Sequence, residues 1–203
     1  MRVFAPYPLL DAAHLSAAPL LATTAMAARL IAGTAPLPWS PAALTLAQLE
    51  AIERSFRRYQ DPGFNLKLAS GARPEEIELS EDPWARLTRF PKTGGTPVLI
   101  IAPSSGHHPT LLRQTAAVLR ETHDVAVAGW RCASHVPLSV GPLGLDAMLD
   151  RILDAVRLYR EETGRGDVHM LAVCQPAPLA LAAAVLLEEA GLPLASLTLM
   201  GGP

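Results

Sequence analysis

The residues of this chain best suited to chemistry stand in one short segment, Ala172-Val173-Cys174-Gln175-Pro176. It joins an apolar run, 168–173, to a stretch rich in alanine and leucine. The run predicts a strand and the stretch a helix. A one-residue turn between them would hold the Cys174 side chain out above a sheet. A nucleophile needs that exposure, and a thiol in such a turn can attack an acyl carbon. The sequence therefore predicts Cys174 as the nucleophile of an acyl-transfer enzyme.

A second candidate segment is the loop 103–108, which follows the apolar strand predicted at Val98–Ala102. In open parallel sheets, sites form beyond the carboxyl ends of the strands. Gly106 lets the backbone turn its N–H groups toward a substrate oxygen. We expect the N–H groups near Gly106 and His107, with that of Gln175, to form an oxyanion hole. The side chains expected to contact substrate are Ser105, His108 and Trp130.

Each of these residues also has a structural interpretation. A lone cysteine at the end of a strand is commonly a small buried hydrophobe. Two adjacent histidines on a loop, His107 and His108, rarely point at one ion, and no third ligand has suitable spacing, so we expect no metal site.

The apolar stretch 15–28 resembles a signal region only weakly, and it is too short and too rich in alanine and threonine to span a membrane. A buried or amphipathic helix is the preferred interpretation.

Composition narrows the class of protein. The formal net charge of the 203-residue chain is −2, without a basic run, so nucleic acid is not an expected partner. Two cysteines without a short-spaced pairing suit a reducing cytosol. We therefore expect a cytoplasmic protein.

Three regions separate along the chain. Residues 1–60 predict helices broken by prolines, including one from Leu44 to Tyr59. Residues 61–97 predict short antiparallel strands, with Phe64, Leu66 and Leu68 alternating with polar residues, followed by a linker. Residues 98–203 alternate apolar strands with helices. The predicted strands are 98–102, 125–130, 168–173 and 194–200, and the predicted helices are 109–120, 146–163 and 176–190.

This pattern predicts the fold class. Strands that are apolar throughout and alternate with helices form a parallel sheet that helices cover on both faces. We expect a doubly wound, mostly parallel α/β sheet, preceded by a helical region and a short antiparallel hairpin. The last strand, 194–200, would leave a bare apolar edge that could pair with another chain and form an oligomer.

Several motifs occur together in the order of one known family. They are Pro103-Ser104-Ser105-Gly106-His107-His108-Pro109-Thr110-Leu111-Leu112-Arg113, His123-Asp124-Val125, Val136-Pro137-Leu138-Ser139, Val173-Cys174-Gln175-Pro176 and Met200-Gly201-Gly202-Pro203. With them the chain resembles the N-terminal half of intracellular polyhydroxyalkanoate depolymerases, which are α/β-hydrolases. The resemblance implies a carboxylic-ester hydrolase acting on storage polyester, mainly polyhydroxybutyrate, at granule surfaces, with Cys174 as nucleophile and no cofactor.

The expectation of an active depolymerase is limited by the residues that follow Cys174, and two other functions are alternatives to it. Members of the family carry the triad acid and histidine beyond the Met-Gly-Gly-Pro segment, whereas this sequence has no Asp or His after Cys174. We therefore expect an inactive N-terminal fragment, truncated before both residues. One alternative is a polyhydroxyalkanoate synthase-like acyltransferase, whose cysteine normally lies between glycines. Another is a non-catalytic protein that binds granules or a partner through its N-terminal helices. The expected partners of the depolymerase are polyhydroxyalkanoate granules or hydroxyalkanoate oligomers.

Overall fold

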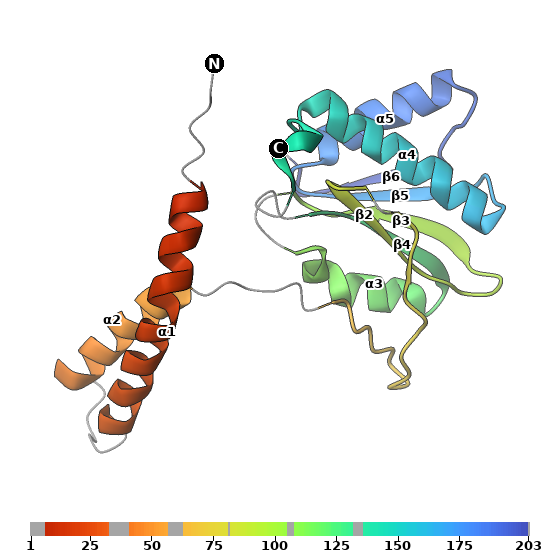
Figure 1. Ribbon diagram of the computed structural model, residues 1–203. Coiled ribbons are helices and arrows are strands. Elements are labelled where there is room, and N and C mark those ends of the chain that lie inside the picture. The colour runs from red at the N-terminus through yellow and green to blue at the C-terminus, as the bar shows by residue number, and fades with distance from the viewer. Residues whose placement is uncertain are drawn as a thin grey trace. The chain divides into compact units, whose positions relative to one another are not determined.

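The computed structural model describes residues 7–32, 41–56, 63–80, 82–104, 108–131 and 136–202. The chain divides into two compact units, residues 1–60 and 61–203 (Figure 1), and each is described here by itself. Among the helices within the described ranges, none is both long and apolar enough to cross a membrane.

The first unit is a pair of helices, α1 (Tyr7–Ala32) and α2 (Pro41–Phe56). They pack side by side, with Ala25 of α1 buried and an ion pair between Arg29 Nε and Glu50 Oε1 at 2.8 Å. Much of the apolar surface of α1 stays outside this contact, because Leu20, Met26 and Leu30 are each about two-thirds exposed or more, at 68%, 65% and 72%. A pair of helices this small buries too little apolar surface to hide such residues.

The second unit is built on a six-stranded sheet in the order β1-β2-β4-β3-β5-β6. The strands are β1 (Ile77–Glu78), β2 (Ala85–Phe90), β3 (Thr96–Ile101), β4 (His123–Trp130), β5 (His169–Val173) and β6 (Ser196–Met200). β1 and β2 are antiparallel to their neighbours, whereas β4, β3, β5 and β6 run parallel. This confirms the predicted α/β class, with a short antiparallel hairpin ahead of a parallel sheet.

Helices cover both faces of the sheet because its central strands are apolar on both sides. The short 3₁₀ helix η1 (Pro109–Leu112) and α3 (Arg113–Arg120) lie on one face, and α4 (Leu145–Thr163) and α5 (Ala177–Glu189) lie on the other (Figure 1). In β3, Leu99 and Ile101 pack toward α4 and α5, whereas Val98 and Ile100 pack toward α3. The two resulting cores fix the sheet, and with it the ends of the strands.

A buried polar cluster lies at the amino end of β4, opposite to the strand ends that carry the candidate site. The carboxylate of Asp124, which is 3% exposed, accepts hydrogen bonds from Arg89 at 3.0 Å to each oxygen, from the Lys92 amide at 2.9 Å and from the Tyr159 hydroxyl at 2.8 Å. Burial is the largest single influence on the pKa of Asp124 and raises it. The three hydrogen-bond donors together outweigh burial, so the pKa lies below its ordinary value.

Three local predictions need correction or adjustment. No strand forms over Phe64–Leu68, although Phe64 and Leu66 are buried as the alternation suggests. Asn65 adopts a left-handed conformation with φ at +46°, which interrupts an extended backbone. The helix expected to begin at Leu44 begins at Pro41, and the part of it expected beyond Phe56 lies outside the described residues. The helix expected over 109–120 starts with the 3₁₀ turn η1.

The outer strand β6 has no further neighbour among the described strands. Its residues Leu199 and Met200 are 44% and 46% exposed. The apolar edge predicted from the sequence is therefore present, while its pairing with another chain stays a prediction.

Candidate active site

Cys174 occupies the turn between β5 and α5. β5 ends at Val173 and α5 begins at Ala177, so three residues carry the chain from strand to helix. Cys174 has φ at +64° and is exposed with a free thiol. A side chain other than glycine rarely adopts a left-handed conformation, and such strained residues cluster at functional sites. The geometry is that of a tight turn that holds one side chain out above the sheet.

Backbone hydrogen bonds hold this turn in place. The Cys174 amide donates to the carbonyl of Met200 at 2.7 Å, and the Cys174 carbonyl accepts from the Ala177 amide at 3.0 Å. Gly202 also lies close against the turn, since a Cβ at this position would come within 2.5 Å of the Ala177 Cβ. Residues at and just after the end of β6 therefore hold the backbone of the strained turn, which fixes the position from which the Cys174 side chain projects.

The loop after β3 reaches the turn from the neighbouring strand. β3 and β5 are parallel neighbours, with Ile101 opposite Ala172, so the two chain segments leave the sheet side by side. The Ser104 hydroxyl donates to the side-chain Oε1 of Gln175 at 2.9 Å. This hydrogen bond joins the start of the loop to the residue that directly follows Cys174.

The expected oxyanion donors are only partly described. The Gln175 amide lies just ahead of α5, where N–H groups have no intrahelical partner. No acceptor takes it up within residues 63–80, 82–104, 108–131 and 136–202. Ser105, Gly106 and His107 lie outside the described residues. His108 is half-buried just ahead of η1. The roles of these residues stay predictions.

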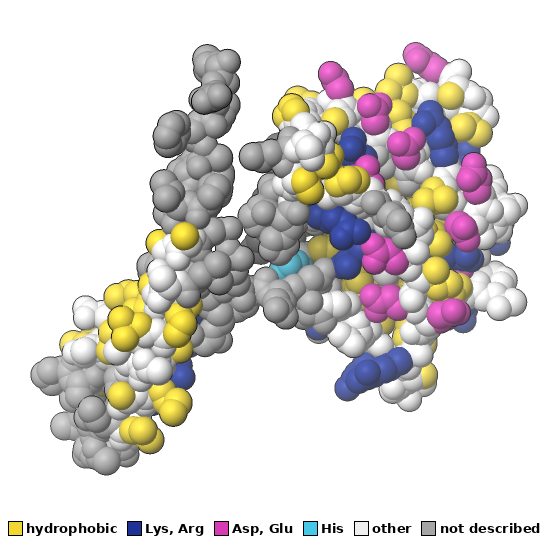
Figure 2. Space-filling model, in the orientation of Figure 1, with side chains coloured by type: hydrophobic (Ala, Val, Ile, Leu, Met, Phe, Trp, Pro, Cys, Tyr) yellow, Lys and Arg dark blue, Asp and Glu magenta, His cyan; other side chains and the backbone are white. Residues whose placement is uncertain are grey.

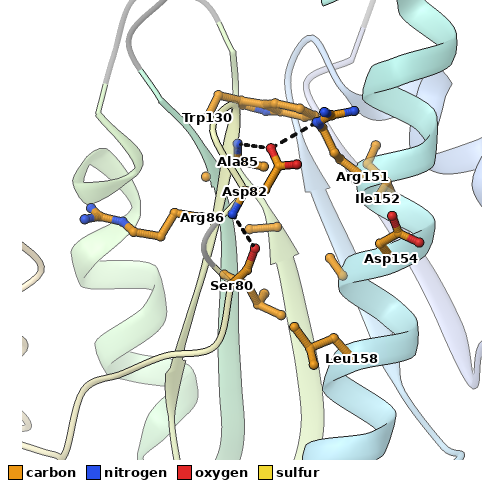
Figure 3. A pocket seen from close by; sticks show the side chains of 13 residues that line it. Ser80, Asp82, Ala85, Arg86, Trp130, Arg151, Ile152, Asp154 and Leu158 are labelled. Carbon is orange, nitrogen blue, oxygen red and sulfur yellow. Dashed lines mark hydrogen bonds and ion pairs between the residues drawn. The ribbon is translucent and has the colours of Figure 1, made fainter. Parts of the chain in front are cut away.

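Trp130 lies at the carboxyl end of β4. Its indole Nε1 donates to the carbonyl of Ala102 at 2.9 Å, and Ala102 directly follows the neighbouring strand β3. Its ring lines a cavity between β2, β4 and α4 (Figure 3). The contact of Trp130 with substrate stays a prediction.

Sequence reasoning missed the polar residues of that same cavity, Asp82 and Arg151. They form an ion pair at 3.1 Å, although 69 residues separate them along the chain. In the sequence, only the segment Asp82-Pro83-Trp84 indicated a local structure, because Asp before Pro is typical of a turn. In the described part of the chain no group of three or more His, Cys, Asp or Glu residues could hold a metal ion.

The comparisons with known proteins concern the fold. No protein-family model matches the chain, and no curated protein does. Among solved structures, the chain is similar to a "putative lipase" from Sulfolobus solfataricus, with a TM-score of 0.50 and 14% identity over 71% of this chain and 49% of that one.

Two further structures are a dienelactone hydrolase from Anabaena variabilis and BphD, the 2-hydroxy-6-oxo-6-phenylhexa-2,4-dienoate hydrolase of Rhodococcus sp. strain RHA1. Their TM-scores are both 0.49, with identities of 17% and 16% over 64% of this chain, and the matches cover 64% and 47% of those chains. The chain thus spans less than two thirds of the length of each of the three structures. At such identities a likeness shows the fold alone. The strand order, the strand–turn–helix at Cys174 and the likeness to the Sulfolobus structure together show that this chain has the α/β-hydrolase fold.

Proposed function

We propose that this chain is a carboxylic-ester hydrolase, or the part of one that carries the nucleophile, and that Cys174 is that nucleophile. One observation carries the proposal: the exposed Cys174 thiol stands on a left-handed turn between a parallel strand and a helix. A strained conformation at this place is hard to explain by packing, because an exposed side chain gains little from burial. We infer that this conformation serves to present the sulfur to a substrate.

In this proposal the Cys174 thiolate attacks the ester carbonyl carbon and forms a C–S bond. The carbonyl oxygen becomes an oxyanion, which the Gln175 amide and a second N–H near Gly106 or His107 stabilise. The ester C–O bond then breaks, the alcohol leaves with a proton, and a thioester remains. Water finally hydrolyses the thioester, which releases the acid and restores the thiol.

We further propose polyester as the substrate class, specifically poly(3-hydroxybutyrate). The motif set around 103–113, 173–176 and 200–203 supports this choice through its resemblance to intracellular polyhydroxyalkanoate depolymerases. The exposed apolar side chains of α1 supply a surface suited to an apolar polymer, because Leu20, Met26 and Leu30 are mostly in solvent. Figure 2 shows hydrophobic side chains on the described surface of the first unit. Under this proposal the granule is the partner, and the first unit contacts it.

The thiol needs a base, and this chain supplies none downstream of it. A cysteine attacks an ester as its thiolate, and a neighbouring base commonly takes the proton of the thiol. The sequence has no His or Asp after Cys174. We therefore expect the 203-residue chain to be acylated by an activated ester but to turn over slowly, because water attack on the thioester also needs a base.

Burst kinetics with the p-nitrophenyl ester of 3-hydroxybutyrate test the proposal. The activated leaving group lowers the need for a base in acylation, so the chain should release about one equivalent of p-nitrophenolate and then continue more slowly, which is the pattern of an accumulating acyl-enzyme. Cys174→Ala should abolish the burst, whereas Cys132→Ala should keep it. A burst that survives Cys174→Ala would refute the assignment of the nucleophile.

Binding to amorphous poly(3-hydroxybutyrate) granules tests the partner separately. Replacing Leu20, Met26 and Leu30 by Glu should weaken co-sedimentation. Val118→Glu is a matched control, because Val118 is 71% exposed on α3 of the second unit. Equal loss of binding in both variants would count against a role for α1. Granule binding by Cys174→Ala without any ester cleavage by the parent chain would favour the non-catalytic alternative.

A further inference from the structure

A cavity on the α4 side of the sheet plays no part in the proposed ester cleavage. It has a volume of about 170 Å³ and lies between β2, β4 and α4, with Trp130 across its upper end (Figure 3). Small residues make the space, because Ala85, Ala128 and Ala155 stand where larger side chains would fill it. The cavity opens to solvent on the side of Asp154, whose side chain is 71% exposed.

The lining of the cavity is apolar over most of its surface. Leu87, Ile152, Leu158 and the Trp130 ring supply most of the walls, to which Ser80, Arg86 and Asp154 add polar atoms. An apolar cavity of about 150 Å³ is large enough for a benzene-sized molecule, so this one accommodates about six carbon atoms.

One end of the cavity is polar and rigid. Asp82 Oδ1 accepts hydrogen bonds from the Trp84 and Ala85 amides at 2.7 and 2.9 Å and from Arg151 Nε at 3.1 Å. Arg151 Nη1 in turn donates to the carbonyl of Ala147 at 2.9 Å. Both side chains are shielded, with exposed fractions of 30% for Asp82 and 23% for Arg151. The pair is therefore held in position before any ligand arrives.

Each member of this pair keeps one polar atom unused. Within the described residues, Arg151 Nη2 has no acceptor and Asp82 Oδ2 has no donor. A ligand head with one acceptor and one donor satisfies both atoms. The lining carries two cationic side chains, Arg86 and Arg151, and two anionic ones, Asp82 and Asp154, so its charges balance and do not favour a head with a net charge.

We propose that this cavity binds a small uncharged amphiphile, with an alkyl tail of about six carbons on the apolar walls and a head that both donates and accepts hydrogen bonds. Alkanamides and short hydroxy esters belong to this class. The head would contact Arg151 and Asp82, and the tail would extend along Ile152 and Leu158. The proposal does not depend on Cys174 or on ester cleavage.

Hexanamide is a suitable probe because it has the required tail and head. In a titration followed by methyl NMR of the ¹³C-labelled chain, we expect saturable shifts at Ile152, Leu87 and Leu158. Arg151→Met should weaken binding about tenfold, the typical effect of losing a hydrogen bond to a charged group. Arg157→Met is the matched control, since Arg157 lies on the same helix but does not line the cavity. Binding should be unchanged in this control.

Filling the cavity gives an independent test. Ala155→Leu should abolish the hexanamide shifts, and Leu158→Trp on the half-buried rim serves if the first variant does not fold. Cys174→Ala should bind hexanamide as the parent does, so failure of the proposed ester chemistry would leave this result unaffected. Absence of saturable shifts, shifts that persist in the filled variants, or equal affinities of Arg151→Met and Arg157→Met would each overturn the proposal.

Discussion

The strain at Cys174 can be measured by comparing Cys174→Gly with Cys174→Ala. A left-handed conformation costs an L-residue about 1–2 kcal/mol, and glycine avoids this cost. Glycine in turn loses about 0.4–1 kcal/mol relative to alanine, because its unfolded chain is more flexible. Burial contributes little at this position, since the side chain is exposed. We therefore expect Cys174→Gly to be the more stable variant by about 0.8 kcal/mol, the difference between the midpoints of the two ranges.

Gln175 is the matched control because it is the next residue and is also exposed, but it does not have a positive φ. There the glycine variant should be the less stable one by about 0.4–1 kcal/mol. Subtracting the two comparisons isolates the strain at Cys174, about 1–2 kcal/mol. Urea unfolding followed by circular dichroism measures all four stabilities. A difference near zero, or one of opposite sign, would refute a strained turn at Cys174.

Three other substitutions test the framework that positions the site. Asp124→Asn should lower the free energy of unfolding by about 2–4 kcal/mol, because it breaks a buried ion pair but keeps part of its hydrogen bonding. Since the pKa of Asp124 is lowered in the folded state, its contribution is present above about pH 4 and lost as the pH falls through the folded-state pKa. Urea titrations below pH 4 should therefore show a weaker loss of stability in Asp124→Asn than in the parent, and equal slopes would contradict this. Tyr159→Phe should cost about 1–2 kcal/mol in the same measurement, and no loss would show that the hydroxyl is dispensable. Gly129→Ala should cost about 1–3 kcal/mol, since its Cβ would lie 2.5 Å from the Pro109 ring, and an unchanged stability would show that the ring yields.

The parallel half of the fold was predictable because its signals are local. Short, continuously apolar segments such as Val98–Ala102 and 168–173, bounded by turn residues, are typical of buried strands. Glycines such as Gly164, with φ at +64° after α4, end the helices between them. The position of Cys174 followed from the same pattern, because the change from strand to helix leaves room for only one short turn.

The remainder depended on contacts that no local pattern reveals. Phe64 and Leu66 alternate with polar residues as in a strand, but Asn65 between them adopts a left-handed conformation that ends the extended backbone. The alternation does not reveal this, because asparagine is a polar residue that also tolerates the conformation of turns and loops. The hydrogen bond from Ser104 to Gln175 joins residues 71 positions apart, and the ion pair of Asp82 with Arg151 joins residues 69 apart. Such pairs exist only once the sheet has brought its strand ends together.

The location of an acyl group after reaction tests the central claim most directly. Trypsin releases Cys174 in a peptide of residues 166–203 and Cys132 in a separate peptide of residues 132–151, because no Lys or Arg follows Arg165 and none lies between Arg131 and Arg151. After a short incubation with the p-nitrophenyl ester of 3-hydroxybutyrate, mass spectrometry should find the hydroxybutyryl group as a thioester on the 166–203 peptide. An acyl group on neither cysteine, or on both peptides in equal amounts, would contradict the role of Cys174 as the nucleophile.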